Sequence, residues 1–474
     1  MSLFDRPGAT IVAPSLRTLR EKSVDAACRK PGCRQEPNDR VRYWKATTLE
    51  RGIAMKKTAL QLTAALLLAS AAGGAHAADC KVTIGVVMEL TGPAGEYGQA
   101  GAKSVEMAFK DINDAGGVNG CKLATDTRDS QSAGNIAVDA ATQLVQVKKV
   151  PVVIGGIMSS VTIPILTSVT GPAKIVQVSP AASSPTLTKL GRDGKTNGIF
   201  FRTITSDALQ GVAAAKYAID SGFKKLAVIH VNNDFGVNMA TEFTHAYKAL
   251  GGVIVSDTPY NEKQSSYASE VTAAMASQPD ALYLISTPVD GATIARTWIS
   301  QGGVQKFLLN DGMNSPDFIE SVGADYLKEA YGTSSGTSPT ASSDYFMKNY
   351  KAFSGGIEPT NPAADRSYDA GAIVGLAIAI ANSQDPAKIR DAIFKAVDPK
   401  GESIFAGKDG FAKALALIKE GKPIRYEGVI GPVNFDQYGD ITGPFRLWKI
   451  VNGKVETTGE MSMDDVAALK QKIQ

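Results

Sequence analysis

The sequence predicts an α/β protein of two lobes, each built on a mainly parallel β-sheet with helices on both faces. From Lys81 onward, short runs of β-branched and apolar residues alternate with amphipathic segments of helical period. This alternation is typical of parallel strands that are joined by helices. The series stops after Phe200-Phe201-Arg202 and then begins again, and two such series indicate two lobes.

The expected strands are the short apolar runs, and the expected helices are the longer amphipathic segments between them. In the first series we expect strands at 81–87, 122–127, 152–154 and 175–178, and helices at 99–115, 133–147 and 161–170. In the second series we expect helices at 208–221, 235–250, 266–276 and 291–301, and strands at 226–231, 253–257, 281–285 and 307–309.

The rest of the chain is mostly helical in pattern. A Gly/Ser/Thr-rich run at 332–343 indicates a crossover between lobes rather than a tether between independent domains. Two apolar segments, 431–435 and 445–451, flank Gly439-Asp440 and predict a hairpin-like or strand-crossing segment. The polar tail at 455–474 predicts a short final helix and no membrane segment. Further helices are expected at 345–353, 369–381, 386–396 and 411–419.

Residues 55–77 have the pattern of a secretory signal peptide. Met55-Lys56-Lys57 gives a positive start, a short apolar run follows, and Ala75-His76-Ala77 is a cleavage site of the A-x-A kind. We therefore expect a periplasmic protein that is cleaved near Ala77. Asp79, directly before Cys80, argues against lipoprotein processing. We interpret residues 1–54, rich in arginine and without periodicity, as a mis-assigned or disordered N-terminal extension; a real basic tail with a partner is the alternative.

The net charge gives no sign of a nucleic-acid or anionic-membrane partner. Residues 1–77 hold 13 Lys/Arg and 6 Asp/Glu, so residues 78–474 carry 37 and 41, a net charge of −4. The apparent basicity of the whole chain therefore belongs to the leader.

Cys80 and Cys121 are the two cysteines after the leader, and each lies just before an expected strand. If those strands are parallel neighbours, their axes lie about 4.8 Å apart, which is within the reach of a disulfide. We predict the bond Cys80–Cys121. A metal site is the alternative, and it lacks partners, because His230 and His245 are the only histidines after the leader and no Cys-x-x-Cys occurs.

The stretch 152–185 combines two strand ends with hydroxyl groups and free backbone amides. Ser159 and Ser160 follow one apolar run, and Ser183 and Ser184 follow the next. In open α/β sheets, ligands bind outside the carboxyl ends of strands, and helix N-termini suit anions. The stretch therefore predicts half of an anion-binding cleft, and simple helix capping by serine is the alternative.

Several segments in a specific order carry a resemblance to a known family. They are LTGPAGEYGQAG (90–101), DINDAGGVNGCKL (111–123), VVIGGIMSS, VSPAASSP and GPVNFDQYGD (431–440). Over essentially the entire chain after the leader, the sequence resembles type I periplasmic binding proteins, in particular the branched-chain amino acid (Leu/Ile/Val)-binding group that feeds ABC importers.

The resemblance implies two Rossmann-like lobes joined by three hinge crossovers near Thr205, Ser335 and Thr442, with the ligand cleft between the lobes. The N-terminal lobe would comprise 78–205 and 336–442, and the C-terminal lobe 206–335 and 443–474. The implied partners are a small ligand and a membrane permease, and we expect a monomer without cofactor or metal.

The resemblance also implies roles for individual residues in ligand binding. Ser159 and Ser183 would hold the ligand's α-carboxylate by hydroxyl and backbone N–H, whereas the Ala181 carbonyl and Asp311 would take the α-ammonium. Tyr97 would cover the side-chain pocket. The full set of expected ligand-binding residues is Tyr97, Met158, Ser159, Ser160, Ala181, Ala182, Ser183, Phe235, Thr287 and Asp311.

Two departures from the family pattern leave the ligand open. Phe235 and Thr287 stand where amino-acid binders of this family often have tyrosines, and Met158 adds an adaptable wall. An aromatic or aliphatic carboxylate or amide without the ammonium is therefore the alternative. A buried carboxylate needs a cation, so Asp311 favours an amine unless it merely begins a helical turn at 314–321.

An exported enzyme is the rival class. Gly92, Gly95, Gly98 and Gly101 follow a strand, but their G-x-x-G-x-x-G spacing is not that of a dinucleotide loop. Neither a Walker lysine nor a G-x-S-x-G elbow is present. We expect a binding protein without catalytic residues, and delivery of the ligand to a separate sensor stays open.

Overall fold

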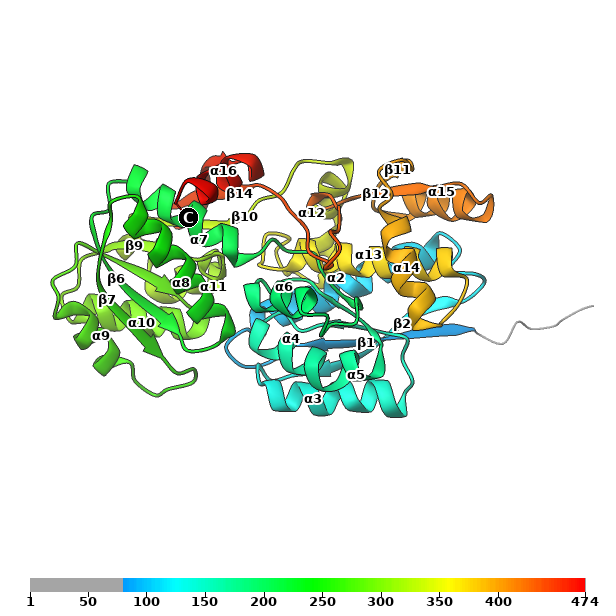
Figure 1. Ribbon diagram of the computed structural model, residues 1–474, viewed down its shortest axis with the longest axis horizontal. Helices are drawn as coiled ribbons and strands as arrows, with labels where there is room; N and C mark the ends of the chain where they lie inside the picture. Colours follow the sequence, from blue (N-terminus) through cyan, green and yellow to red (C-terminus); the bar gives the residue numbers. More distant parts are fainter. Residues whose placement is uncertain (1–79, 474) are drawn as a thin grey trace, which may run out of the picture. The chain divides into compact units, whose positions relative to one another are not determined.

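The computed structural model describes residues 80–473. The extension expected at 1–54 and the signal peptide expected at 55–77 lie outside the described residues, as does the expected cleavage site. Within the described range, two sheets carry helices on both faces (Figure 1). The predicted α/β class with two lobes is confirmed. We call the first sheet with the helices packed on it the first lobe, and the second sheet with its helices the second lobe.

The first lobe is built on five parallel strands in the order β2-β1-β3-β4-β5. Its inner strands are β-branched, and β3 and β4 are buried along their whole length. The strands are β1 (Lys81–Met88), β2 (Lys122–Asp129), β3 (Val152–Gly155), β4 (Val176–Ser179) and β5 (Phe200–Arg202).

The helices between these strands follow the predicted rhythm with shifted ends. They are α2 (Gly95–Asp114), α3 (Gly134–Thr142), α4 (Ser159–Ile165), α5 (Gly171–Ala173) and α6 (Pro185–Arg192), and π-helical turns at Gln143–Val147 and Leu166–Thr170 extend α3 and α4. A β-carbon on Gly98 would lie 2.0 Å from the Glu89 carbonyl oxygen. The glycine at this position therefore allows α2 to pack closely on the end of β1.

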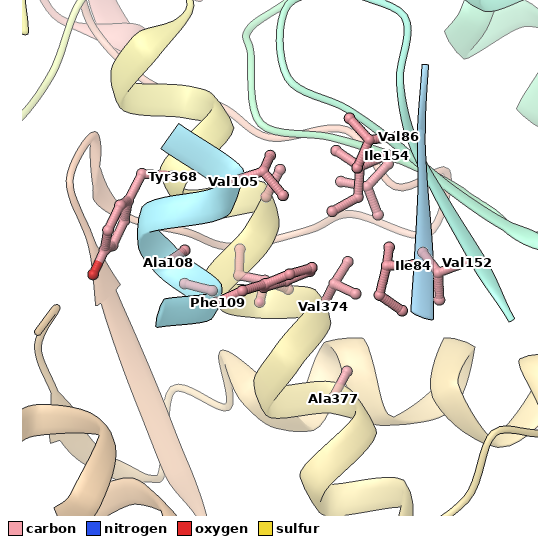
Figure 2. Packing of buried hydrophobic residues seen from close by; sticks show 14 of the residues in the cluster. Ile84, Val86, Val105, Ala108, Phe109, Val152, Ile154, Tyr368, Val374 and Ala377 are labelled. Atoms are coloured by element: carbon pink, nitrogen blue, oxygen red, sulfur yellow. The ribbon is translucent and has the colours of Figure 1, made fainter. Parts of the chain in front are cut away.

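Residues far along the chain complete the core of the first lobe. Figure 2 shows Val374 of α13 between Phe109 of α2 and Ile84 of β1, whereas the ring of Tyr368 points away from the strands. Burial of these apolar surfaces stabilises the lobe. The late helices are α12 (Ala341–Ser354), α13 (Ala364–Ala381), α14 (Pro386–Ala396) and α15 (Lys408–Lys419), with a small sheet of β11 (Glu402–Ile404), β12 (Ile424–Gly428) and β13 (Gly431–Pro432).

The second lobe is built on seven strands in the order β15-β14-β10-β9-β8-β6-β7. The strands β6 to β10 are parallel, and β14 and β15 are antiparallel additions at one edge. The strands are β6 (Lys225–Val231), β7 (Val253–Tyr260), β8 (Ala281–Ile285), β9 (Lys306–Leu309), β10 (Glu329–Ser335), β14 (Phe445–Val451) and β15 (Lys454–Met461).

Helices cover both faces of this second sheet, and its last helix, α16, packs against its first helix, α7. The amine of Lys470 on α16 donates to the Ala208 carbonyl of α7 at 2.7 Å, and Figure 1 shows α16 beside α7. The helices are α7 (Asp207–Asp220), α8 (Asp234–Ala249), α9 (Ala268–Met275), α10 (Pro288–Ser300), α11 (Pro316–Val322) and α16 (Met463–Ile473), with 3₁₀ turns at Asp311–Met313 and Ala324–Tyr326. No helix within residues 80–473 is both long enough and apolar enough to span a bilayer.

The segments 431–435 and 445–451 form the predicted strand-crossing segment rather than the alternative, a hairpin. Residues of β13 pair with β12 in the first lobe, whereas β14 pairs with β10 and β15 in the second. The chain crosses between lobes between these two segments, and the bridge of Phe435 with Ile441 and hydrogen bonds between Asp436 and Asp440 close the turn at Gly439-Asp440. Part of the run 332–343 expected as a crossover is strand, because β10 continues to Ser335.

The predicted disulfide is present. Cys80 and Cys121 are bonded, with their Cα atoms 4.6 Å apart. They precede strands that pair in register, Lys81 opposite Lys122. The disulfide therefore joins the starts of two neighbouring parallel strands, as the sequence predicted.

The passages of the chain between the lobes lie side by side. The hydroxyls of Thr205 and Ser335 are hydrogen-bonded, and the amide of Gly336 donates to the Pro444 carbonyl at 2.7 Å. Three short segments that touch one another can act as a common hinge while each lobe keeps its own core.

Candidate ligand-binding site

A cavity of about 280 Å³ lies where residues that follow the strands of both lobes face one another. The first lobe contributes residues after β3 and β4, and the second lobe contributes residues after β6, β8 and β9. Ligands in α/β proteins bind at this carboxyl edge. The lining includes Met158, Ser159, Ala181, Ser183, Phe235, Ser286, Thr287, Asn310, Asp311 and Gly312.

Eight of the ten residues expected to bind the ligand line this cavity, and two do not. Ala182 is fully buried, its amide donates to the Ser179 hydroxyl at 3.0 Å, and its carbonyl accepts from Arg202 at 3.1 Å. Ser160 lies one position further along α4 than Ser159 and is absent from the lining. The eight are Tyr97, Met158, Ser159, Ala181, Ser183, Phe235, Thr287 and Asp311.

The two cavity serines differ in what they can donate. The Ser159 hydroxyl oxygen accepts from the Ser184 amide at 3.1 Å, which leaves its own hydrogen for another acceptor. The Ser183 hydroxyl donates to the carboxyl of Asp207 at 2.9 Å and is therefore occupied. Among residues 80–473, no acceptor lies within hydrogen-bond distance of the Ser159 or Ser183 amide. Ser183 thus offers its amide to the cavity rather than its hydroxyl.

Glu89, which the sequence reasoning missed, accounts for the other amides at the start of α4. It is fully buried after β1 and accepts from the amides of Ile157 (3.0 Å) and Met158 (2.9 Å). Burial raises the pKa of Glu89 to about 7, and the two amides oppose that shift. A carboxylate within the apolar run VVMEL was the available signal. The carboxylate of Glu89 therefore occupies the amides of Ile157 and Met158. The next amide along the chain is that of Ser159, which lines the cavity.

Acceptors lie on the other side of the cavity. One carboxyl oxygen of Asp311 accepts from the Gly312 amide at 3.1 Å and from the Asn310 side chain at 3.3 Å. The other oxygen has no hydrogen-bond donor in the described part of the chain, and nor has the Ala181 carbonyl. Burial raises the pKa of Asp311, opposed by Asn310 and by the charge of Arg366.

The sequence left open whether Asp311 faces the cavity or merely begins a turn, and in the structure it does both. It begins a turn, the 3₁₀ segment Asp311–Met313, and α11 begins only at Pro316 with Ser315 as its cap. Its carboxylate nevertheless lines the cavity. The turn therefore fixes the position of the carboxylate through one oxygen and leaves the other oxygen free to accept a hydrogen bond.

Tyr97 closes the cavity from the first lobe. Its ring is 8% exposed, and its hydroxyl donates to the carbonyl of Gly312 in the second lobe. Thr287 is almost fully buried, and in the chain from 80 to 473 its hydroxyl has no hydrogen-bond partner. A phenol, an unsatisfied hydroxyl, Met158 and the half-buried ring of Phe235 thus surround the space.

Further hydrogen bonds join the lobes around the cavity. The Ser315 hydroxyl donates to Glu96 at 2.5 Å, the Lys263 amine donates to the Gln131 carbonyl at 3.0 Å, and the Asn238 amide donates to the Ser184 hydroxyl at 3.3 Å. Burial raises the pKa of Glu96 to about 7. The lobes are therefore also joined by hydrogen bonds between residues that do not line the cavity.

The sequence reasoning also missed the hinge end of the cavity. Ser334, Ser335, Asp365, Arg366 and Arg446 line it there. Two arginines in one cavity were not visible from the sequence, because they lie 80 residues apart and neither belongs to a motif. Residues 80–473 contain no group of three or more His, Cys, Asp or Glu side chains placed to hold a metal ion.

Comparisons with known proteins agree with this geometry. Residues 81–454 match the model of a family described as periplasmic binding protein. The chain is 26% identical over 400 residues to Leu/Ile/Val-binding protein homolog 3 of Brucella melitensis, with 84% of this chain and 98% of that protein covered. It is 28% identical over 327 residues to an amino acid binding protein of Pseudomonas aeruginosa, with 68% and 85% covered.

Solved structures share the fold. A leucine binding protein LivK from Thermotoga maritima has a TM-score of 0.69 at 23% identity, with 81% of this chain and 99% of that chain covered. A solute binding protein from R. palustris in complex with 4-hydroxybenzoate has a TM-score of 0.66 at 18% identity, with 82% and 100% covered. The family match spans most of the chain, and the chain belongs to the periplasmic binding protein family.

Proposed function

We propose that this protein is the periplasmic solute-binding component of an ABC importer, and that it captures an amino acid, branched-chain or related, between its lobes for delivery to a membrane permease. The observation that supports this most is the pairing of free amides with a free carboxylate oxygen in one cavity. Its relatives named for Leu/Ile/Val or amino acid binding support the same ligand class. We further propose export by the signal peptide and a monomeric state.

The proposed contacts follow from the groups left without partners. The ligand's α-carboxylate accepts from the Ser159 hydroxyl and from the amides of Ser159 and Ser183. Its ammonium donates to the Ala181 carbonyl and to Asp311. A zwitterion satisfies both ends, since charge-assisted hydrogen bonds are stronger than neutral ones.

The side chain of the ligand then contacts the remaining walls. We propose that Tyr97, Met158, Phe235 and Thr287 surround it. The lobe division proposed for binding assigns 78–205 and 336–442 to one lobe and 206–335 and 443–474 to the other, so lobe closure brings the two halves of the site together.

A second ligand class has one observation in its favour. A structural relative is described in complex with 4-hydroxybenzoate, which has no ammonium, and Phe235 and Thr287 replace the expected tyrosines. In that case an aromatic or aliphatic carboxylate or amide occupies the cavity. Asp311 then faces no cation, which is costly for a buried carboxylate.

The test is a thermal-shift screen of protein purified from the periplasm after expression of the full chain. The probes are the twenty amino acids, small amides, and aliphatic and aromatic acids. A ligand present at about 1,000 times its Kd adds about 4 kcal/mol of apparent stability. A shift with an amino acid supports the proposal, whereas shifts with only amine-free acids contradict the role of Asp311.

A further inference from the structure

The hinge end of the cavity contains a partly buried cationic side chain, that of Arg446, which forms no ion pair within residues 80–473. Arg446 lies at the start of β14, opposite Ser334 of β10, and both line the cavity. No carboxylate lies within 4.0 Å of the Arg446 guanidinium in the part of the chain that the structure describes. Its buried Nε has no hydrogen-bond partner there.

Arg366, beside it, is already neutralised. Its Nη1 contacts both carboxylate oxygens of Asp365 at 2.8 and 2.9 Å, and its Nη2 donates to the Ser335 carbonyl at 2.8 Å. It is 8% exposed, and its Nε has no partner within the described residues. Asp365 therefore offsets one guanidinium, and one positive charge at this end is left over.

A third unsatisfied group lies at the same place. The hydroxyl of Ser334 is buried, lines the cavity, and has no hydrogen-bond partner among the residues from 80 to 473. Buried polar groups are normally hydrogen-bonded, and an uncompensated buried charge is costly. Burial and the neighbouring Arg366 charge both lower the pKa of Arg446, and the charge of Asp365 opposes them.

We propose that Arg446, with Arg366 and Ser334, forms a second anion subsite that binds a carboxylate on the ligand's side chain. The inference rests on the proposed function, in which Ser159 and Ser183 already hold the α-carboxylate, and it shares no residue with that anchor. It specifies the substrate class: an amino acid whose side chain ends in a carboxylate. Guanidinium groups suit this role, because they donate to both carboxylate oxygens in a fixed fork.

The experiment compares each acid with its amide, which has nearly the same shape and no charge. Calorimetric titration of protein purified from the periplasm uses L-glutamate against L-glutamine, and L-2-aminoadipate against its 6-amide. For at least one length, we expect the acid to bind at least tenfold tighter than the amide. R446Q removes this preference by weakening the acid at least tenfold and the amide less than threefold, and R446K retains part of it.

A matched control and a folding check separate binding from structure. R390Q removes a guanidinium from α14, where it contacts Asp391 outside the cavity, and it leaves the preference unchanged. Thermal melts show whether R446Q folds. If R446Q fails to fold, the acid-to-amide ratio of the unmodified protein and of R446K still decides the matter.

The remaining outcomes distinguish the two proposals. Equal binding of acid and amide, or equal weakening of both by R446Q, overturns the subsite and leaves amino-acid binding intact, as does binding of leucine alone. If neither pair binds but glutarate binds at least tenfold tighter than its monoamide and R446Q abolishes the difference, the subsite stands and the ammonium contact of Asp311 fails. If glutarate and both pairs all fail to bind, the subsite is overturned, and the screen of the twenty amino acids decides the proposed function.

Discussion

The hydroxyl of Tyr97 on α2 donates a hydrogen bond to the carbonyl of Gly312, so one side chain of the first lobe is fastened to the second lobe. The ring is buried, and a β-carbon on Gly312 would lie 2.9 Å from the tyrosine oxygen. The hydrogen bond can therefore form only when the two lobes lie close together. Because Tyr97 also lines the cavity, the same side chain contributes to closure and to the site.

Removing that hydroxyl should weaken ligand binding without unfolding the protein. Y97F keeps the ring and loses the hydrogen bond between the lobes, a contribution of about 1 kcal/mol, so we expect about fivefold weaker binding with faster dissociation. Stopped-flow and calorimetric titrations measure both. Y217F is the control, since Tyr217 bonds to Thr458 within the second lobe. Unchanged affinity in Y97F would show that Tyr97 plays no part in closure.

Closure should also respond to pH through Glu96. Its carboxylate accepts from Ser315 across the lobes, and burial raises its pKa to about 7, with the nearby charge of Asp317 adding to the shift. A carboxyl whose pKa is raised on closing favours the closed form below its ordinary value, and this contribution is lost as the pH rises through 7. We expect binding to weaken between pH 5 and 8 from this group, by up to about 70-fold if the whole rise of the pKa from 4.5 to about 7 accompanies closing.

The variant E96Q isolates this effect, because the amide can still accept from Ser315 but does not titrate. Its affinity should lose this pH dependence and should exceed that of the unmodified protein at pH 8. E106Q, on the same helix and paired with Lys103 at the surface, is the control. Parallel pH profiles for E96Q and the unmodified protein would exclude Glu96 as the titrating group.

Asp311 should decide whether the ligand carries an ammonium group. D311N removes the negative charge and keeps the size, so an amino acid should lose about 100-fold in affinity, as expected for a hydrogen bond to a charged group. An analogue without the amine should bind no worse than before. Calorimetry with each member of such a pair measures this, with D325N as a control, because Asp325 is paired with Lys328 at the surface. Equal losses for both analogues would assign Asp311 a purely structural role.

The disulfide should stabilise the fold without affecting the site. Cys80 and Cys121 are 41 residues apart in sequence, and closing a loop of this length contributes about 4 kcal/mol in the chain-entropy model. The double variant C80S/C121S should lose about that much free energy of unfolding in urea and keep its ligand affinity. A thiol assay on denatured, unreduced protein should find no free thiol, and two thiols would contradict the bond.

The sequence predicts what local pattern determines and misses what distant segments build together. The strands of the first series and the disulfide follow from periodicity and from cysteine position, and the cavity serines follow from strand ends. The packing of α13 on α2 does not follow from such local patterns, because nothing in the sequence of residues 364–381 indicates which helix they pack against. The sequence left a hairpin and a strand crossing open at 431–435 and 445–451 for the same reason: two apolar runs around a turn look alike whether they pair with each other or belong to different sheets.

The candidate site shows the same division. Eight expected residues line the cavity because each stands next to a strand end or in a family motif. Glu89, Arg366 and Arg446 were missed because their roles depend on how deeply they are buried and on which residues lie beside them. The local sequence predicts neither. Ala182 was wrongly predicted to line the cavity. Its neighbours Ala181 and Ser183 do line it, because alternate residues of the segment after β4 face opposite sides.

The late strand β14 has a consequence for biogenesis. It pairs with β10, closes the edge of the second sheet, and brings Arg446 into the cavity. Until residues 445–461 have been synthesised, β10 remains an open strand edge, and such edges recruit other chains. The cavity is therefore complete only after the last strands have folded, and the unfinished polypeptide is exposed to aggregation until then.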